Sequence, residues 1–211
     1  MAQDLVAIAM ADGAISLEER RMIMEICQKE GISDETVNNC LLGFDKDEES
    51  ILPSKPRERT RYLINLIRVM GVDGVCTHME IYLLEIIASK MGFTHLELVS
   101  LVLMTATRRF FAGDTGSRVL ASFLQNEIDP RGKNLRDNHE NIRKMFDLMA
   151  ETVPQLQDEQ DDTEAFVRAM NRATDLLKEN SLLSEEFRMI GIDFETVLMD
   201  EREQAIRRWI R

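Results

Sequence analysis

Two stretches of this chain carry the same pattern of residues. Residues 5–42 align with residues 66–103 without a gap, at an offset of 61 positions. Apolar positions match even where identities differ, and identical residues recur at equivalent places: Asp12-Gly13 with Asp73-Gly74, Glu19 with Glu80, Lys29 with Lys90, and Gly31 with Gly92. Because an internal repeat constrains the architecture before any single element is assigned, we expect two copies of one helical unit packed into one bundle. Such a bundle presents an Asp-Gly corner twice.

Each copy has the spacing of three helices. Apolar residues recur every three or four positions and strand-like alternation is scarce, which predicts an all-α fold. Three capping boxes, in which Ser or Thr is followed three residues later by Glu, mark helix starts at Ser16, Thr77 and Thr94. Gly31 and Gly92 stand where a helix ends in a left-handed residue. Each copy is therefore predicted to be helix, Asp-Gly corner, helix, glycine corner, helix.

The rest of the chain divides into loops and further helices. Residues 44–59 are charged and contain two prolines, which predicts a loop between the copies. A second break is expected at residues 112–116. We expect further helices at residues 117–128, 135–153, 163–179, 182–190 and 194–210, with a turn at 129–132 and an acidic loop at 157–162. The predicted organisation is a double-repeat helical domain over residues 1–112 and a helical C-terminal region over residues 113–211.

The chain is acidic in both halves, with a formal net charge of -12. Such a charge repels phosphate backbones and anionic lipid, so we expect neither nucleic acid nor a membrane as a partner. It suits divalent cations or a basic protein surface. No segment approaches about 18 consecutive apolar residues and no signal-peptide pattern is present, so we expect no membrane insertion. The three cysteines are an odd number in no metal-binding spacing, which predicts a reduced protein in the cytoplasm.

The Asp-Gly corners, MADGAISLEE and GVDGVCTHME, resemble the motif of the TerB-like superfamily, an aliphatic helix ending in A-D-G-x-[IV]-[ST]-x-x-E and repeated once. This superfamily includes the tellurite-resistance protein TerB and the N-terminal domain of the DjlA co-chaperones. The resemblance covers residues 1–110, and residues 111–211 match no recognisable pattern. It implies an all-helical fold with the two copies related by a pseudo-two-fold axis. It also implies a stress-response or chaperone-linked role.

The resemblance further implies a cluster of acidic side chains where the two corners meet, which binds a divalent cation such as Ca²⁺ or Mg²⁺. The matching residues are Asp12, Glu19, Asp73 and Glu80. The chain departs from the pattern at one pair of positions, because Glu18 in the first copy is replaced by Met79 in the second. The first copy therefore has the acidic pair Glu18 and Glu19, whereas the second copy keeps Glu80 alone.

The residues themselves leave two interpretations of these four carboxylates open. Hard cations require oxygen ligands, which carboxylates supply. Alternatively, Asp12 and Asp73 each hold a turn in which the following glycine takes a positive φ. Glu19 and Glu80 would then cap their helices, where a carboxylate also interacts well with the helix N-terminus. Both roles are compatible only if the cation takes the oxygen that capping leaves free.

No catalytic constellation is present: the chain lacks a Ser-His-Asp set, a nucleophile elbow and a phosphate-binding glycine loop. Cys76 and His78 have two interpretations. They bind a soft metal as a pair, or Cys76 is a buried residue of a hydrophobic staple that faces Ile81 while the His78 ring is exposed. The 13 methionines are expected mainly in the core, although Met also lines adaptable binding surfaces.

We therefore expect a non-enzymatic binding module with a protein partner and a divalent-cation site. The alternatives are a metal-free structural or scaffold protein that acts only through protein contacts, and an enzyme or enzyme subunit whose chemistry lies in residues 111–211.

Overall fold

The computed structural model describes residues 1–43, 51–107, 110–111, 113–126, 143–144, 146–147, 163–178, 185, 188–189, 191 and 193–210. All regular secondary structure in these residues is helical, and none of it is strand, which confirms the predicted all-α class. The helices, in chain order, are α1 (Ala2–Ala9), α2 (Leu17–Lys29), α3 (Asp34–Leu42), α4 (Pro56–Met70), α5 (His78–Lys90), α6 (His95–Thr107), α7 (Thr115–Asn126), α9 (Thr163–Lys178) and α11 (Phe194–Ile210).

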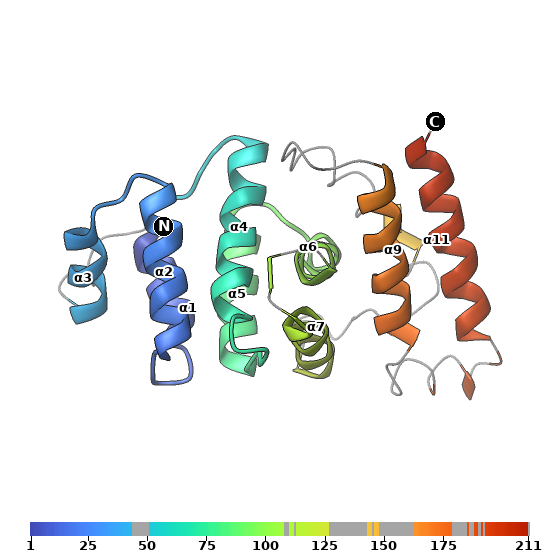
Figure 1. Cartoon of the computed structure of the whole chain (residues 1–211), viewed down its shortest axis with the longest axis horizontal. Coiled ribbons are helices and arrows are strands. Elements are labelled where there is room, and N and C mark those ends of the chain that lie inside the picture. Colours follow the sequence, from blue (N-terminus) through green and yellow to red (C-terminus); the bar gives the residue numbers. More distant parts are fainter. Residues whose placement is uncertain are drawn as a thin grey trace.

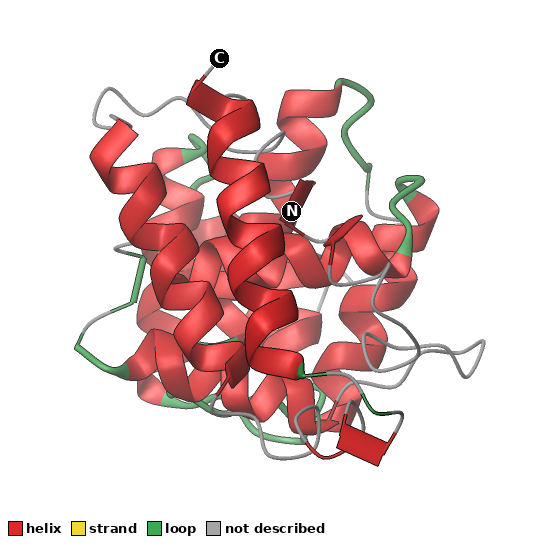
Figure 2. Cartoon of the chain, turned by 90° about the vertical axis from the view of Figure 1, so that its right-hand side faces the viewer, coloured by secondary structure: helices red, strands yellow, loops and turns green. Residues whose placement is uncertain are grey.

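The helices follow one another along the long axis of the molecule, with α1, α2 and α3 at one end and α9 and α11 at the other (Figure 1). Helix α1 packs against α2, α3, α4 and α5, and α6 packs against α7 and α9. Figure 2 shows α9 and α11 side by side, and these two helices pack closely on each other. The buried apolar residues form one cluster that runs from α1 to α11. The two sequence regions therefore share one core.

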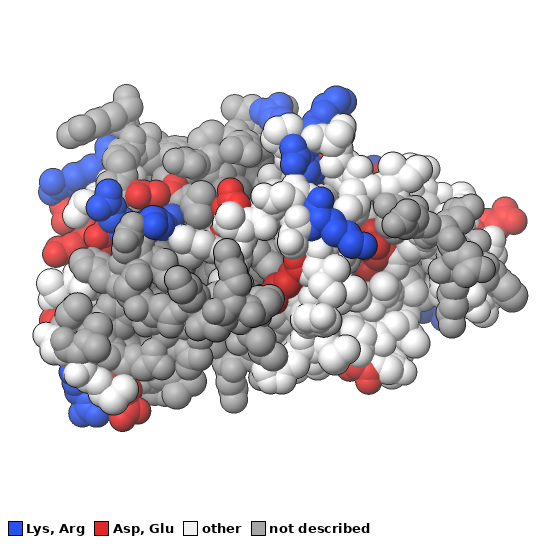
Figure 3. All heavy atoms as spheres, turned by 180° about the vertical axis from the view of Figure 1, so that it is seen from behind, with Lys and Arg blue, Asp and Glu red and all other residues white. Residues whose placement is uncertain are grey.

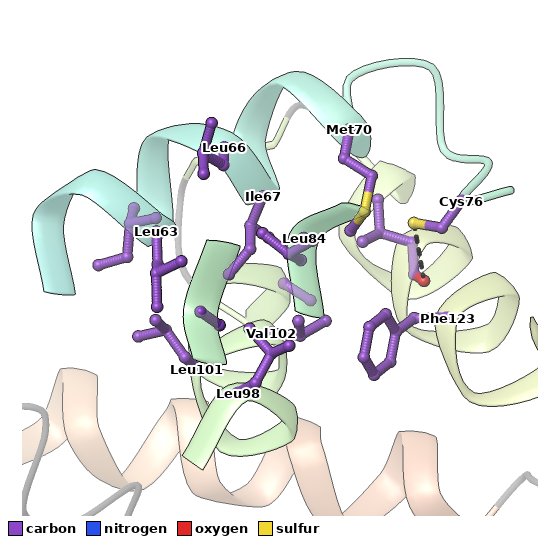
Figure 4. Packing of buried hydrophobic residues seen from close by; sticks show 14 of the residues in the cluster. Leu63, Leu66, Ile67, Met70, Cys76, Leu84, Leu98, Leu101, Val102 and Phe123 are labelled. Atoms are coloured by element: carbon purple, nitrogen blue, oxygen red, sulfur yellow. Dashed lines mark hydrogen bonds between the residues drawn. The ribbon is translucent and has the colours of Figure 1, made fainter. Parts of the chain in front are cut away.

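Side chains from three consecutive helices fill the middle of this core. Figure 4 shows Ile67 of α4 and Leu84 of α5 pointing toward each other, above Val102 of α6. All three residues are completely buried. Phe123 of α7, which is also fully buried, lies on the side of the cluster below Met70 and Cys76 in Figure 4. The interior of the second copy is thus completed by a helix that lies outside the repeat.

The local signals in the repeat produce the predicted ends of helices. The side chains of Ser16 and Thr77 each accept the backbone N–H of the residue three positions later, and both capping boxes are complete. Thr94 makes the same reciprocal pair of bonds with Glu97 at the start of α6. Gly31 and Gly92 have φ values of 73° and 85°, which only glycine adopts without strain. The predicted starts of α2, α5 and α6 and the predicted glycine ends of α2 and α5 are therefore confirmed.

Two predicted boundaries are wrong. Helix α4 begins at Pro56, inside the loop predicted for residues 44–59. Proline suits the first position of a helix, because its φ is already helical and its missing N–H has no intrahelical partner there. Helix α7 begins at Thr115, inside the break predicted for residues 112–116. Gly116 lets its first turn lie directly on α6, since a Cβ at this position would be 2.1 Å from the carbonyl oxygen of Ala106.

Apart from the start of α7, the C-terminal predictions are confirmed where they fall on described residues. The helices predicted at 163–179 and 194–210 are α9 and α11. The turn at 129–132, residues 44–50 of the loop predicted at 44–59, and the acidic loop at 157–162 lie outside the described residues, as do most of the helices predicted at 135–153 and 182–190.

The prediction that methionines fill the core is only partly right. Met70, Met91, Met104 and Met170 are buried, whereas Met79, Met189 and Met199 are exposed. In the part of the chain that the structure describes, no single helix has the length and apolar character to cross a membrane. Helices α5 and α6 meet those criteria only as a pair, which is bent by 118° at the break between them.

Candidate functional site at the paired Asp-Gly corners

The two Asp-Gly corners lie on the same side of the helix bundle. Corner 1, residues 10–16, connects α1 to α2, and corner 2, residues 71–77, connects α4 to α5 (Figure 1). Helix α1 packs against both α4 and α5, which brings the corners near each other. Glu19 and Glu80 lie in the first turns of α2 and α5, directly after the corners. Besides burial, the charge of Asp73 raises the pKa of Glu19, and the charges of Glu19 and Asp12 raise the pKa of Glu80, so the acidic groups of the two corners are close enough to interact.

The two aspartates hold equivalent turns. Oδ1 of Asp12 accepts the backbone N–H of Ala14 at 3.1 Å, and Oδ1 of Asp73 accepts that of Val75 at 2.8 Å. The glycine between each pair has a positive φ, 102° in corner 1 and 87° in corner 2. Both aspartates are exposed, so their remaining oxygens face solvent at the edge of the site. This geometry is the turn that the structural interpretation predicted.

The two glutamates are buried in capping boxes. Oε2 of Glu19 accepts the backbone N–H of Ser16 at 2.7 Å. Oε2 of Glu80 accepts both the backbone N–H of Thr77 at 2.6 Å and its hydroxyl at 2.7 Å. Only 7% of Glu19 and 4% of Glu80 is exposed. Each carboxylate therefore uses one oxygen to start its helix, as the capping interpretation predicted.

Burial makes these carboxylates hard to ionise. It raises the pKa of Glu19, although hydrogen bonds from Ser16 oppose the shift. Burial also raises the pKa of Glu80 to about 7, against the hydrogen bonds from Thr77 and with a smaller contribution from the charges of Glu19 and Asp12. Like charges close together in a partly desolvated site favour uptake of a proton or a cation. Charges near each corner thus add to the raised pKa of the buried glutamate near the other, and we call the two corners with Glu19 and Glu80 the acidic site.

The four carboxylates do not converge on a single point. Among the described residues, no group of three or more His, Cys, Asp or Glu side chains is placed to hold a metal ion. Their chemistry nevertheless suits a hard cation, because Mg²⁺ in proteins is often held by one or two carboxylates and retains several waters. Direct coordination by all four carboxylates, in contrast, would require their side chains to move.

Corner 2 differs from corner 1 because α7 covers it. The hydroxyl of Ser122 accepts the N–H of Cys76 at 2.8 Å and donates to its carbonyl oxygen at 3.2 Å. The Cys76 thiol donates to the carbonyl oxygen of Val119 at 3.8 Å, as drawn in Figure 4. The guanidinium of Arg118 lies directly against Gly74. The sequence did not indicate Val119 and Ser122, because they lie 43 and 46 positions from Cys76 in a region with no recognisable motif.

The proposed soft-metal pair of Cys76 and His78 is not supported by this arrangement. Cys76 is fully buried in the apolar cluster, and burial raises the pKa of its thiol. His78, at the first position of α5, is exposed. The sulfur therefore belongs to the packing between corner 2 and α7, as expected for a buried staple residue.

Comparisons with protein families, with curated proteins and with solved structures find no match to this chain. The resemblance to TerB-like proteins therefore stays a prediction that depends on the two corner motifs. Function has to be inferred from the acidic site and from the surfaces around it.

Proposed function

We propose that this protein is a non-enzymatic binding module of the TerB-like kind, which takes Ca²⁺ or Mg²⁺ at the paired corners and recognises a protein partner. The observation that carries the proposal is the position of the corners: carboxylates from both copies share one end of the helices, and their charges act on one another. By resemblance, the module would serve a stress-response or chaperone-linked system in the cytoplasm.

A divalent cation would relieve the repulsion within this site. The capping boxes occupy Oε2 of Glu19 and Glu80, so a cation would approach their other oxygens and the exposed carboxylates of Asp12 and Asp73. Waters retained by the ion would bridge the gaps that the four side chains leave, as is usual for Mg²⁺. The cation would then connect the two copies and hold the corners together.

A specific observation favours the second candidate, a metal-free scaffold. All four carboxylates already bond to the backbone, as Asx turns at Asp12 and Asp73 and as caps at Glu19 and Glu80. These bonds account for the four residues without any ion. Under this alternative the acidic corners only shape the fold, and the protein acts through its surfaces alone.

Thermal unfolding with and without divalent cation separates the two candidates. A ligand of the native state must raise the unfolding midpoint by mass action, so Ca²⁺ or Mg²⁺ should stabilise the wild type. The double variant Asp12→Asn with Asp73→Asn should lose that response, because asparagine keeps the turn-forming oxygen but removes the charge.

The capping variants Ser16→Ala and Thr77→Ala are the controls. Each should cost about 1 kcal/mol of stability through loss of a cap, while the response to cation is retained. An unfolding midpoint of the wild type that is the same in EDTA and in either cation would reject the cation site in favour of the scaffold.

A further inference from the structure

Three large apolar side chains are exposed together where corner 2 enters α5. The exposed fractions are 51% for Val75, 56% for Met79 and 50% for Tyr82. Met79 and Tyr82 are three residues apart in α5, which places them on one side of the helix, and Val75 lies in corner 2 just before the N-cap residue Thr77. Single exposed apolar residues are ordinary, but an adjacent group is typical of an interaction site. We call these three residues the α5 face.

The first copy of the repeat provides an internal comparison for this face. Its equivalent residues are Ala14, Glu18 and Arg21, which are also exposed. Both helices begin with the same complete capping box. The start of such a helix therefore folds well with a short side chain and two charged ones at these positions. The apolar residues of the α5 face are therefore not required to start the helix.

The charge around the α5 face is negative. Within residues 71–82 the exposed carboxylate is that of Asp73, Glu80 is buried, and there is no lysine or arginine. The guanidinium of Arg118, which lies against Gly74, is 3.9 Å from the carboxylate of Asp114 and is offset by it. The net charge of the whole chain is -12. A second copy of this chain or an anionic lipid surface would be repelled, whereas a positively charged partner would be attracted.

We propose that the α5 face docks a basic amphipathic helix of a partner protein, an inference that rests on the proposed binding function and names the chemistry of its partner. The apolar side of that helix would cover Met79 and Tyr82. Methionine adapts to different apolar surfaces, and tyrosine is enriched among the residues that dominate binding energy. Lysine or arginine at the edge of the partner helix would lie beside the exposed carboxylate of Asp73. An amphipathic partner helix presents its own apolar anchors at helical spacing.

The test uses the full-length protein in EDTA and a fluorescently labelled synthetic helix of leucine and lysine, about 18 residues or five turns long. Fluorescence anisotropy should show saturable binding that weakens as salt is added. The variant Met79→Glu with Tyr82→Arg introduces the first-copy residues and leaves the net charge unchanged. Its affinity should fall by more than about tenfold, since truncating central anchors has at least this effect.

Matched controls make the outcome decisive. Leu42→Gln removes an apolar side chain that is 69% exposed on α3 and should leave binding unchanged. Asp73→Asn should weaken binding and reduce its dependence on salt. A peptide of the same composition in scrambled order, and one with glutamate in place of lysine, should bind poorly.

Several results would overturn the docking proposal: equal affinity of wild type and the Met79→Glu/Tyr82→Arg variant, equal binding of the scrambled peptide, or no binding to the leucine-lysine helix. Concentration-dependent dimerisation that the double variant abolishes, or binding of the α5 face to anionic vesicles, would assign the face to another occupant. Because the titration is done in EDTA, failure of the cation site does not affect it. Stabilisation by cation without peptide binding would reject only the docking face.

Discussion

The buried carboxyl group of Glu80 should make the protein less stable as pH rises from about 4.5 to about 7. The pKa of Glu80 is held at about 7 in the folded protein, mainly by burial, against an ordinary value of 4.5. The folded protein therefore binds this proton more tightly than the unfolded chain does. Its contribution to stability is complete below pH 4.5 and is lost as pH rises through 7. A shift of this size corresponds to about 3 kcal/mol, since one pKa unit is worth about 1.4 kcal/mol.

The substitution Glu80→Gln isolates this contribution. The glutamine oxygen can still accept the backbone N–H of Thr77, but the side chain no longer titrates. The difference in free energy of unfolding between wild type and variant should change by about 3 kcal/mol between pH 4.5 and pH 8, in the direction that favours the variant at high pH. For a chain of this size the same change is about 6–12 °C in the unfolding midpoint.

Urea unfolding in a series of buffers from pH 4.5 to pH 8 measures the effect directly. Titrating groups that do not interact with Glu80 cancel in the difference, whereas the charges of Glu19 and Asp12 act on Glu80 and are part of the measured effect. Glu97→Gln is the control, because it removes a capping carboxylate from α6 at a position that is less buried than Glu80. Parallel stability curves for wild type and Glu80→Gln, or an equal pH-dependent difference for Glu97→Gln, would refute burial of Glu80 as the cause.

Three further predictions concern packing outside the acidic site. Gly116→Ala should destabilise the protein by about 1–3 kcal/mol in chemical denaturation, because its Cβ would meet the Ala106 carbonyl of α6; an unchanged midpoint would contradict this close approach. Ser122→Ala should cost about 1–3 kcal/mol, because the hydroxyl bonds both backbone groups of Cys76 and its loss leaves them without this partner; a neutral result would mean that water replaces it. Burial raises the pKa of Cys27 to about 11, so iodoacetamide at pH 8 should label it in urea but not in the native protein, as mass spectrometry would show.

Local signals in the chain predicted the helix ends well because each acts over a few residues. A capping box needs only Ser16 or Thr77 and the glutamate three positions later, and a left-handed helix end needs only glycine at Gly31 or Gly92. Pro56 was misplaced in a loop because proline is equally at home in a loop and at the first position of a helix. Neighbouring residues alone do not distinguish the two.

Positions at which the two copies of the repeat differ also carry structural information. Helix α2 carries an exposed arginine at position 20, whereas the equivalent residue of α5 is Ile81, which is buried. Helix α5 packs against α7, which follows the repeat. Differences between two copies therefore indicate where each one contacts something that the other lacks. Glu18 and Met79 occupy equivalent exposed positions in the two copies. By the same reasoning, the replacement of a charged residue by an apolar one points to a contact made at the α5 face.

The one-dimensional pattern determined which residues start, end and turn the helices, because those choices depend on hydrogen bonds and backbone angles within a single turn. Tertiary packing decided the properties on which the functional proposals depend. The packing of the helices buries Glu80 near the charges of Asp12 and Glu19, and α7 covers Cys76. Packing also left Met79 in solvent, since apolar character sets how strongly a side chain avoids water but not which neighbour is present to cover it.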